Sequence, residues 1–237
     1  MNTNKKVLVS DYDQTFYLND EDIKSNIEAV SKFRKKGNIF IIATGRSYLD
    51  FQKKVNIYHF KYDYVILNHG AIILDKSDNV IASFAIEPKI LNKIEEDLQL
   101  DKTISSFCCS NLESRVDFTH GNISKINARY YEKKDALNID KIIKSKYQDY
   151  INSFYVPEDS LEIISNKTNK SIAINILLEK LNINKDNVYT IGDGYSDIEM
   201  VKNYNGYAMI NSVRELKKIA IKEYESVSDL IFYILNQ

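Results

Sequence analysis

Two aspartates follow directly after residues that predict a buried strand. Val7-Leu8-Val9-Ser10 is the predicted strand, and Asp11, Asp13 and Thr15 come after it at alternate positions. A carboxylate at the end of a buried strand is costly unless a partner compensates for its lost hydration. Two carboxylates there indicate a metal ion, and a metal ion beside a free carboxylate indicates catalysis.

Other polar groups stand at comparable places along the chain. Thr44 and Gly45 follow one predicted strand, Asp193 follows another, and Lys170 opens a predicted helix. In a parallel sheet the carboxyl ends of the strands meet at one edge, where ligands bind. We therefore expect these groups to lie together although they are far apart in the sequence.

Such a group of side chains suits phosphoryl transfer. Asp11 is the candidate nucleophile, which would form an aspartyl-phosphate. A carboxylate that attacks a phosphate dianion meets charge repulsion, and Mg²⁺ held by Asp11, Asp193 and the backbone carbonyl of Asp13 would offset it. Oxygen ligands favour magnesium over zinc. Asp13 is the candidate acid and base, which would protonate the leaving alcohol and then activate water.

The remaining groups are candidates for holding the phosphate. Thr44 and the Gly45 amide, at a predicted helix start, would bind phosphoryl oxygens. Lys170 would add a fixed positive charge against the developing negative charge. Taken singly, these features have ordinary explanations as solvated turns, helix caps or surface lysines. The hypothesis depends on their conjunction, each after a buried strand or at a helix start.

The elements that position these residues alternate between strand and helix patterns. This alternation predicts an α/β fold with a Rossmann-like, doubly wound parallel sheet. The middle segments are shorter and more polar, with predicted helices at 88–99 and 138–147 and predicted strands at 115–119 and 125–131, which indicates an inserted α/β cap. We expect a core domain at residues 1–84 and 161–237 and a cap domain at 85–160. The predicted core strands are 7–10, 39–43, 64–67, 71–74, 80–84, 188–191 and 207–210, and the predicted core helices are 21–36, 169–181, 197–203, 212–220 and 228–235.

Composition narrows the class of protein. The 237 residues carry 32 basic and 33 acidic side chains, so no basic surface favours nucleic acid as the main partner. No apolar run approaches the length of a membrane span, and no signal-peptide core is evident, so we expect a cytoplasmic protein with no membrane partner. The adjacent Cys108 and Cys109 fit reduced, partly buried thiols. The oligomeric state stays open.

The motifs together resemble those of the haloacid dehalogenase superfamily, in its Cof-type (IIB) branch of phosphatases. Asp11-Tyr12-Asp13-Gln14-Thr15 resembles the first motif, DxDGT, and Ala43-Thr44-Gly45-Arg46-Ser47 resembles the second. Residues 161–170 resemble the stretch that leads to the motif lysine, and residues 192–200 resemble the fourth motif, GDGxND. The resemblance implies a Rossmann-like core, an inserted cap, magnesium dependence and phosphatase activity on small phosphorylated metabolites.

Some positions depart from the family pattern. Gln14 stands where glycine is usual, and Ser196 and His69 each stand where asparagine is usual. Ser196 stays a candidate for phosphate binding. Asp197 is a candidate for supporting the metal site, through water or through a contact with the groups that bind the metal.

Two lysines compete for the role of the motif lysine. Lys170 is preferred to Lys167 because Asn169 before it is a suitable N-cap. A helix start at that point would place Lys170 where an anion binds.

The favoured function is hydrolysis of a small phosphate monoester, such as a sugar phosphate or a cofactor phosphate. A phosphomutase or phosphotransferase would use the same nucleophile, and a non-catalytic metabolite-binding protein is a further alternative. A dinucleotide-dependent dehydrogenase is disfavoured, because no GxGxxG follows the first strand. The cap is the expected source of specificity, and Arg115, His120, Arg129 and Tyr130 are side chains there that would meet a substrate if they faced the site.

Overall fold

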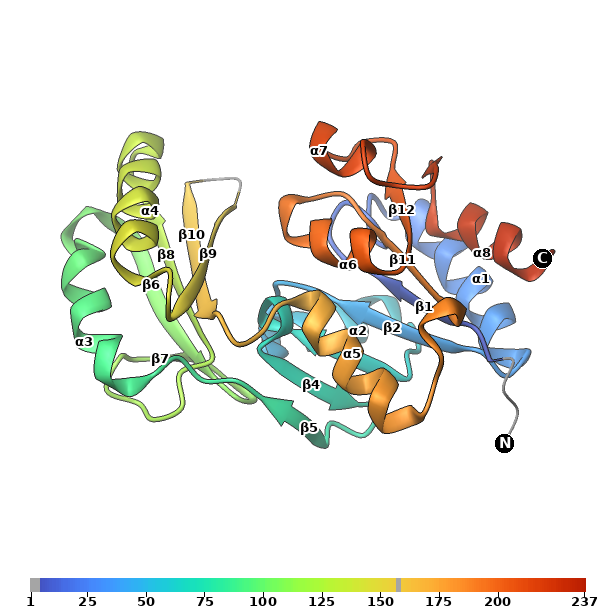
Figure 1. Cartoon of the computed structure of the whole chain (residues 1–237), viewed down its shortest axis with the longest axis horizontal. Helices are drawn as coiled ribbons and strands as arrows, with labels where there is room; N and C mark the ends of the chain where they lie inside the picture. Colours follow the sequence, from blue (N-terminus) through green and yellow to red (C-terminus); the bar gives the residue numbers. More distant parts are fainter. Residues whose placement is uncertain (1–4, 157–158) are drawn as a thin grey trace.

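The computed structural model describes residues 5–156 and 159–237, which form two sheets. The larger sheet has the strand order β13-β12-β11-β1-β2-β3-β4-β5, and the smaller one has the order β7-β6-β8-β10-β9. Figure 1 shows the smaller sheet at the left and the larger sheet at the right, as separate layered units of one elongated molecule. The predicted α/β fold class with a parallel sheet is confirmed.

The larger sheet is built around β1. Its strands are β1 (Val7–Ser10), β2 (Ile39–Ala43), β3 (Tyr64–Leu67), β4 (Ile72–Asp75), β5 (Val80–Ser83), β11 (Val188–Gly192), β12 (Asn205–Met209) and β13 (Glu223–Tyr224). β1 is parallel to both of its neighbours, β2 and β11, whereas β4 and β5 run antiparallel at one edge. The ends of β1, β2 and β11 therefore lie side by side.

Helices cover both faces of this sheet. They are α1 (Asp22–Lys35), α2 (Tyr48–Tyr58), α5 (Lys170–Leu181), α6 (Ile198–Asn203), α7 (Arg214–Lys217) and α8 (Val227–Leu235). Along β1, Leu8 packs into the core cluster that contains the apolar side chains of α1, α2 and α8. Val7 and Val9 pack instead into the cluster formed with α5, α6 and α7. Because side chains alternate along a strand, a continuous apolar run serves both faces of a parallel sheet.

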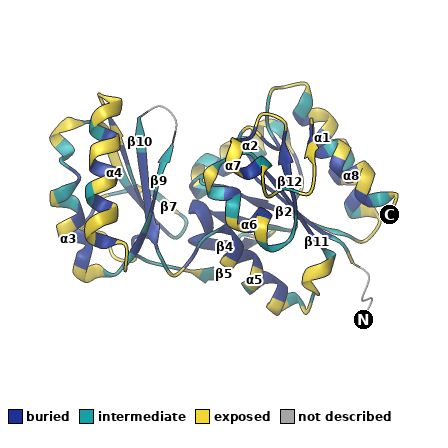
Figure 2. Cartoon of the chain, turned by 45° about the horizontal axis from the view of Figure 1, so that its top comes forward, coloured by how far each residue is buried: buried dark blue, intermediate teal, exposed yellow. Residues whose placement is uncertain are grey.

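Among the described residues, the smaller sheet carries helices on one face only (Figure 1). Its strands are β6 (Thr103–Ser110), β7 (Glu113–Val116), β8 (Lys125–Tyr130), β9 (Ile151–Val156) and β10 (Ser160–Ser165), and its helices are α3 (Pro88–Asp97) and α4 (Lys133–Tyr147). In Figure 2 both helices show exposed outer faces and pack against buried strands. The residues of β8 alternate strictly, with Ile126, Ala128 and Tyr130 in the cluster under the helices. The opposite face of this sheet lines a cavity between the two sheets.

Several details differ from the predicted elements. The predicted strand 115–119 is β7 at Glu113–Val116, and β6, β9 and β10 were not predicted as strands. β6 has few apolar residues, because one of its faces is not part of a core. The Tyr130 side chain faces the helices, where its hydroxyl donates to the Leu98 carbonyl, and it does not meet the cavity.

The boundary between the two predicted domains needs adjustment. β10 pairs with β8 and β9 through Ser165 and makes no pairing with the larger sheet. A boundary after residue 160 would cut this strand. We propose that the inserted segment runs to Ser165, beyond the predicted 85–160. Within the part of the chain that the structure describes, no helix is both long and apolar enough to cross a membrane.

Candidate active site

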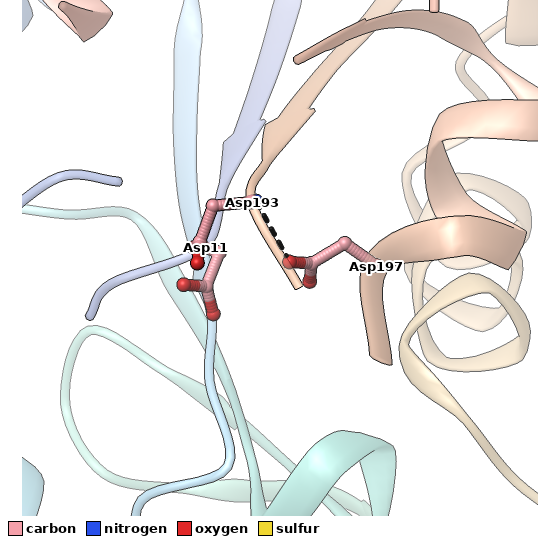
Figure 3. A group of neighbouring side chains, drawn as sticks. All are labelled: Asp11, Asp193 and Asp197. Carbon is pink, nitrogen blue, oxygen red and sulfur yellow. Dashed lines mark hydrogen bonds between the residues drawn. The ribbon is translucent and has the colours of Figure 1, made fainter. Parts of the chain in front are cut away.

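Three aspartates converge where β1 and β11 end. Carboxylate oxygens of Asp11, Asp193 and Asp197 lie within 4.8 Å of one another. Figure 3 shows Asp11 and Asp193 following neighbouring strands, with Asp197 reaching toward them from the turn before α6. Asp11 and Asp197 are buried, and Asp193 is half-buried. The strand order places them together as the sequence predicted.

Lys170 balances part of this negative charge. Its Nζ donates to Oδ1 of Asp11 and to Oδ1 of Asp197, each at 2.6 Å. The lysine side chain is 1% exposed. It is the first residue of α5, and the N-cap side chain of Asn169 accepts from the backbone N–H of Ile172. The predicted capping signal therefore starts the helix that holds this ammonium beside Asp11.

Lys167 lies elsewhere. Its side chain is 62% exposed, and its Nζ pairs with Glu87 at 3.1 Å. It does not contact the aspartate cluster. Of the two lysines that the sequence left in competition, only Lys170 occupies the predicted position.

Asp197 has both carboxylate oxygens in use. While Oδ1 accepts from Lys170, Oδ2 accepts from the backbone N–H groups of Asp193 and Gly194, at 3.1 and 2.9 Å. A Cβ added to Gly192 would collide with the Asp197 carboxyl group, so a glycine there permits this close approach. Asp197 thus holds the turn that carries Asp193 and orients Lys170.

Crowding of carboxylates changes their proton affinity. Burial raises the pKa of Asp11 well above its usual range, and the charge of Lys170 only partly opposes it. Burial, with the nearby charge of Asp197, raises the pKa of Asp193 to about 6. The hydroxyl of Thr15 donates to Asp193 Oδ1 at 2.7 Å and lowers that pKa in part. Three carboxylates facing one ammonium leave the cluster short of positive charge.

The donor set of this cluster fits a hard divalent cation. Carboxylate oxygens, with no sulfur or imidazole among them, are the ligands that Mg²⁺ takes in proteins. A cation there would also offset the burial and the mutual repulsion that together raise the pKa of Asp11 and of Asp193.

The predicted phosphate-binding turn lies beside the cluster. Thr44 follows β2, and its Oγ1 accepts from the backbone N–H of Arg46 at 3.1 Å. Among the described residues, no acceptor takes the backbone N–H of Gly45. Ser196 lines the same cavity. Gln14, which stands where the family has glycine, has a left-handed φ of 60°, a conformation that glycine adopts without a steric cost.

Asp13 does not join the carboxylate cluster through its side chain. Its two carboxylate oxygens accept from Nε and a terminal nitrogen of Arg46, at 2.8 and 2.7 Å. Its predicted metal contact was through the backbone carbonyl, which stays a prediction. Arg46 had no predicted role, although its place directly after Thr44 and Gly45 was a usable signal.

The cluster forms one end of a cavity of about 520 Å³ between the two sheets. The larger sheet contributes the aspartates and the Thr44–Gly45 turn. The smaller sheet contributes Arg115, Lys125 and Arg129. Arg115 and Arg129 were considered from the sequence. His120 is not among the lining residues of this cavity; it pairs with Glu113 at 3.0 Å.

Lys125 and Glu162 were missed by sequence reasoning. They face the cavity from β8 and β10 and form a buried pair, with Lys125 Nζ 2.7 Å from Glu162 Oε1. His69 Nε2 hydrogen-bonds the other oxygen of Glu162. Burial lowers the pKa of His69. Burial acts to raise the pKa of Glu162, but Lys125 and His69 outweigh it and the pKa is lowered. The alternation of polar and apolar residues along 125–130 was the available signal.

Comparison with known proteins agrees with this geometry. A family model described as haloacid dehalogenase-like hydrolase matches residues 8–117 and 105–229. The 5-amino-6-(5-phospho-D-ribitylamino)uracil phosphatase of Bacillus subtilis is 26% identical, over 91% of this chain and 88% of its own.

Solved structures share the fold. A haloacid dehalogenase-like hydrolase from Bacteroides thetaiotaomicron has a TM-score of 0.82 at 19% identity, covering 97% of this chain and 99% of its own. A phosphatase of the same superfamily from that organism has a TM-score of 0.80 at 20% identity, covering 99% of this chain and 96% of its own. The match confirms the predicted family, with its Cof-type resemblance, and the predicted class of enzyme, a phosphatase. The chain therefore belongs to the haloacid dehalogenase-like hydrolases.

Proposed function

We propose that the chain is a magnesium-dependent phosphatase that hydrolyses a small phosphate monoester through an aspartyl-phosphate on Asp11. The observation that carries this proposal is the place of Lys170 Nζ, 2.6 Å from a carboxylate oxygen of Asp11 and of Asp197. A buried carboxylate beside a fixed ammonium suits attack on a phosphate whose negative charge must be offset.

The reaction would proceed in two halves. A carboxylate oxygen of Asp11 bonds to phosphorus while the bond to the ester oxygen breaks, and Asp13 gives its proton to the leaving alcohol. Asp13 then takes a proton from water as the water oxygen bonds to phosphorus and the bond to Asp11 breaks, which releases inorganic phosphate. The Asp13 side chain is 46% exposed, so water reaches it for the second half of the reaction.

The other residues of the site would hold the phosphate and the cation. Thr44 and the Gly45 amide, in the turn before α2, and Ser196, in the turn before α6, would bind phosphoryl oxygens. Asp11, Asp193 and the backbone carbonyl of Asp13 would hold Mg²⁺, supported by Asp197. When bound there, Mg²⁺ supplies positive charge against the repulsion between the carboxylate and the phosphate dianion.

The cavity supports a small polar substrate. Its volume of about 520 Å³ suits a small metabolite. Cationic and amide side chains on its wall, including Arg46 and Asn127, favour hydroxyl and anionic groups. Sugar phosphates and cofactor phosphates are therefore the proposed substrates. The ribitylaminouracil phosphate named for the Bacillus subtilis relative belongs in the first screen.

The test is a screen of phosphorylated metabolites and an aryl phosphate, with Mg²⁺ and with a chelator. We expect hydrolysis only with Mg²⁺, and none above background in Asp11→Asn. Unchanged turnover by Asp11→Asn would disprove the proposal. Transfer of the phosphoryl group to a sugar in place of water would show the mutase or transferase alternative, and tight binding without turnover would show the non-catalytic one.

The compartment is also a proposal. Cys108 and Cys109 are buried and free, and burial raises the pKa of Cys108 to about 12. Two protonated thiols without a disulfide agree with a reducing cytoplasm.

A further inference from the structure

A chain of buried titratable groups joins the smaller sheet to the phosphate-binding turn. Glu162 on β10 pairs with Lys125 on β8 and with His69, which follows β3 of the larger sheet. All three residues are less than 10% exposed. Asn127 Nδ2 also donates to Glu162, at 3.1 Å. The Glu162 carboxylate therefore accepts hydrogen bonds from side chains of both sheets.

Lys125 also reaches past Glu162 to the turn itself. Its Nζ donates to the backbone carbonyl of Gly45 at 2.7 Å. The preceding carbonyl, that of Thr44, accepts from the backbone N–H of His69 at 3.0 Å. Both carbonyls of the turn are thus held, one by an ammonium of the smaller sheet and one by a backbone amide of the larger sheet.

These two bonds fix the direction of the amides that would bind phosphate. A peptide unit is planar and trans, so its N–H points opposite to its carbonyl. Holding the Thr44 carbonyl sets the direction of the Gly45 N–H, and holding the Gly45 carbonyl sets that of the Arg46 N–H. The Arg46 N–H then meets Thr44 Oγ1, and the Gly45 N–H is left for a ligand.

The His69 ring reinforces this arrangement from the side. A Cβ on Gly45 would collide with that ring, so the ring lies directly against the turn. The ring in turn stacks on Phe154 of β9, with centroids 4.6 Å apart and planes at 24°. Since Glu162 holds Nε2 and Phe154 holds the face, the ring has little freedom to move away from Gly45.

A purely structural ion pair would need only Lys125 and Glu162. The additional bond to the Gly45 carbonyl places the ammonium on the turn, and Lys125 lines the cavity that contains Asp11. We propose that Lys125, backed by Glu162 and His69, is a positioning residue that sets the Thr44–Gly45 turn for phosphate binding. This inference rests on the proposed function, because it takes that turn to be the phosphate site.

The test uses the whole protein and inorganic phosphate as the probe. Competitive inhibition of aryl phosphate hydrolysis gives the inhibition constant Ki of phosphate for each variant. We expect Ki to rise about tenfold in Lys125→Met, because a charge-assisted hydrogen bond to the turn is lost. Lys125→Arg should recover part of the affinity, since a guanidinium still donates to a carbonyl. Lys141→Met, at an exposed lysine of α4, is the matched control and should leave Ki unchanged.

A second variant serves as the control for loss of folding. Lys125→Met leaves the Glu162 carboxylate buried without its main partner, which risks unfolding. The double variant Lys125→Met/Glu162→Gln removes both charges, and circular dichroism with thermal unfolding checks its fold. Partial unfolding lowers the maximal rate but leaves the Ki of the remaining active enzyme unchanged. A raised Ki in a folded variant supports the positioning role.

The outcomes separate the two proposals. The inference is overturned if Lys125→Met and the folded double variant are both active and both keep the Ki of the unaltered protein. That result would leave the proposed phosphatase function standing. If the unaltered protein shows no magnesium-dependent hydrolysis, the proposed function fails. Calorimetric titration of phosphate into the unaltered protein and Lys125→Met then decides whether Lys125 sets a phosphate-binding turn.

Discussion

Asp13 and Arg46 form a two-point ion pair at the mouth of the site, with distances of 2.7 and 2.8 Å. Arg46 follows directly on the Thr44–Gly45 turn, so the pair ties the proposed acid and base to the proposed phosphate site. Its guanidinium also lies over the Tyr12 ring, 5.5 Å from the centroid. Arg46 therefore has a fixed place from which to aim Asp13.

Arg46→Gln should lower kcat by roughly ten- to hundredfold, because a misplaced catalytic group costs about that much. Arg46→Lys keeps the charge but not the two-point geometry, so its kcat should lie between those of the unaltered protein and Arg46→Gln. The pair is partly exposed, so we expect little change in thermal stability. Steady-state kinetics on an aryl phosphate measure the effect.

The chain offers a matched control for this prediction. Arg34 makes the same two-point pair with Asp63, at 2.9 and 2.7 Å, between α1 and the start of β3 and outside the cavity. Arg34→Gln should leave kcat unchanged. Equal losses in both variants would mean that the Arg46 pair has only a general structural role.

The two lysines near the start of α5 give a second prediction. Lys170→Met should lower kcat by about 10²–10³-fold, the usual effect of removing one preorganised charge from a transition state. It should also reduce the stability of the metal-free protein by about 3–5 kcal/mol, because Asp11 and Asp197 lose their buried partner. Kinetics and denaturant unfolding measure the two effects separately.

Lys167→Met is the control for Lys170→Met. Lys167 is 62% exposed and pairs only with Glu87 among the described residues, so neither kcat nor stability should change appreciably. Loss of activity in Lys167→Met with an active Lys170→Met would reverse the assignment of the motif lysine.

The sequence was sufficient to predict which edge of the larger sheet brings the candidate site residues together, because that edge follows from topology. Parallel strands bring their carboxyl ends together, so Asp11 after β1 and Asp193 after β11 had to become neighbours. The N-cap at Asn169 predicted the start of α5 and hence the place of Lys170. Apolar periodicity and helix-capping residues are local features, so they can be read from a single sequence.

The far wall of the cavity could not be predicted in the same way. Lys125 and Glu162 are 37 positions apart and meet through antiparallel pairing of β8 and β10. Lysine and glutamate are ordinarily surface residues, so neither suggests a buried partner. The ion pair of Asp13 with Arg46 depends on rotamers, which residue types alone do not determine.

Magnesium affinity should depend on pH through Asp193. Its pKa is raised to about 6, chiefly by burial and secondly by Asp197, against 3.8 for the isolated group. Between these values the folded, metal-free protein holds a proton that the unfolded chain has lost. The shift therefore destabilises the metal-free fold as pH rises from about 4 to 6.

A bound cation requires the ionised carboxylate, so Mg²⁺ should bind more tightly at pH 7.5 than at pH 5.5. Calorimetry in buffers of different ionisation enthalpy measures both the affinity and the protons released. Thr15→Val removes the hydroxyl that lowers the Asp193 pKa, so it should move the pH dependence to higher pH. Equal affinities at pH 5.5 and 7.5 in the unaltered protein would contradict this account.

Gln14 gives the last prediction, since it stands directly after Asp13 with a left-handed φ of 60°. A side chain in this conformation costs about 1–2 kcal/mol, and glycine avoids that cost at the expense of about 0.5–1 kcal/mol for its greater freedom in the unfolded chain. Its backbone carbonyl accepts from Asn211 at 3.0 Å, a bond that glycine would keep. Gln14→Gly should therefore raise stability by about 0.5–1 kcal/mol, measured by denaturant unfolding, and should leave kcat at or above its original value.

Gln148→Gly is the matched control, because Gln148 is exposed but has a helical φ of −53° at the end of α4. There the same substitution should lower stability by about 0.5–1 kcal/mol, since glycine only adds freedom to the unfolded chain. Opposite signs for the two variants would show that the loop after Asp13 keeps the shape that the family forms with glycine. A loss of both stability and kcat in Gln14→Gly would instead mean that the Gln14 side chain, which lines the cavity, holds that loop in place.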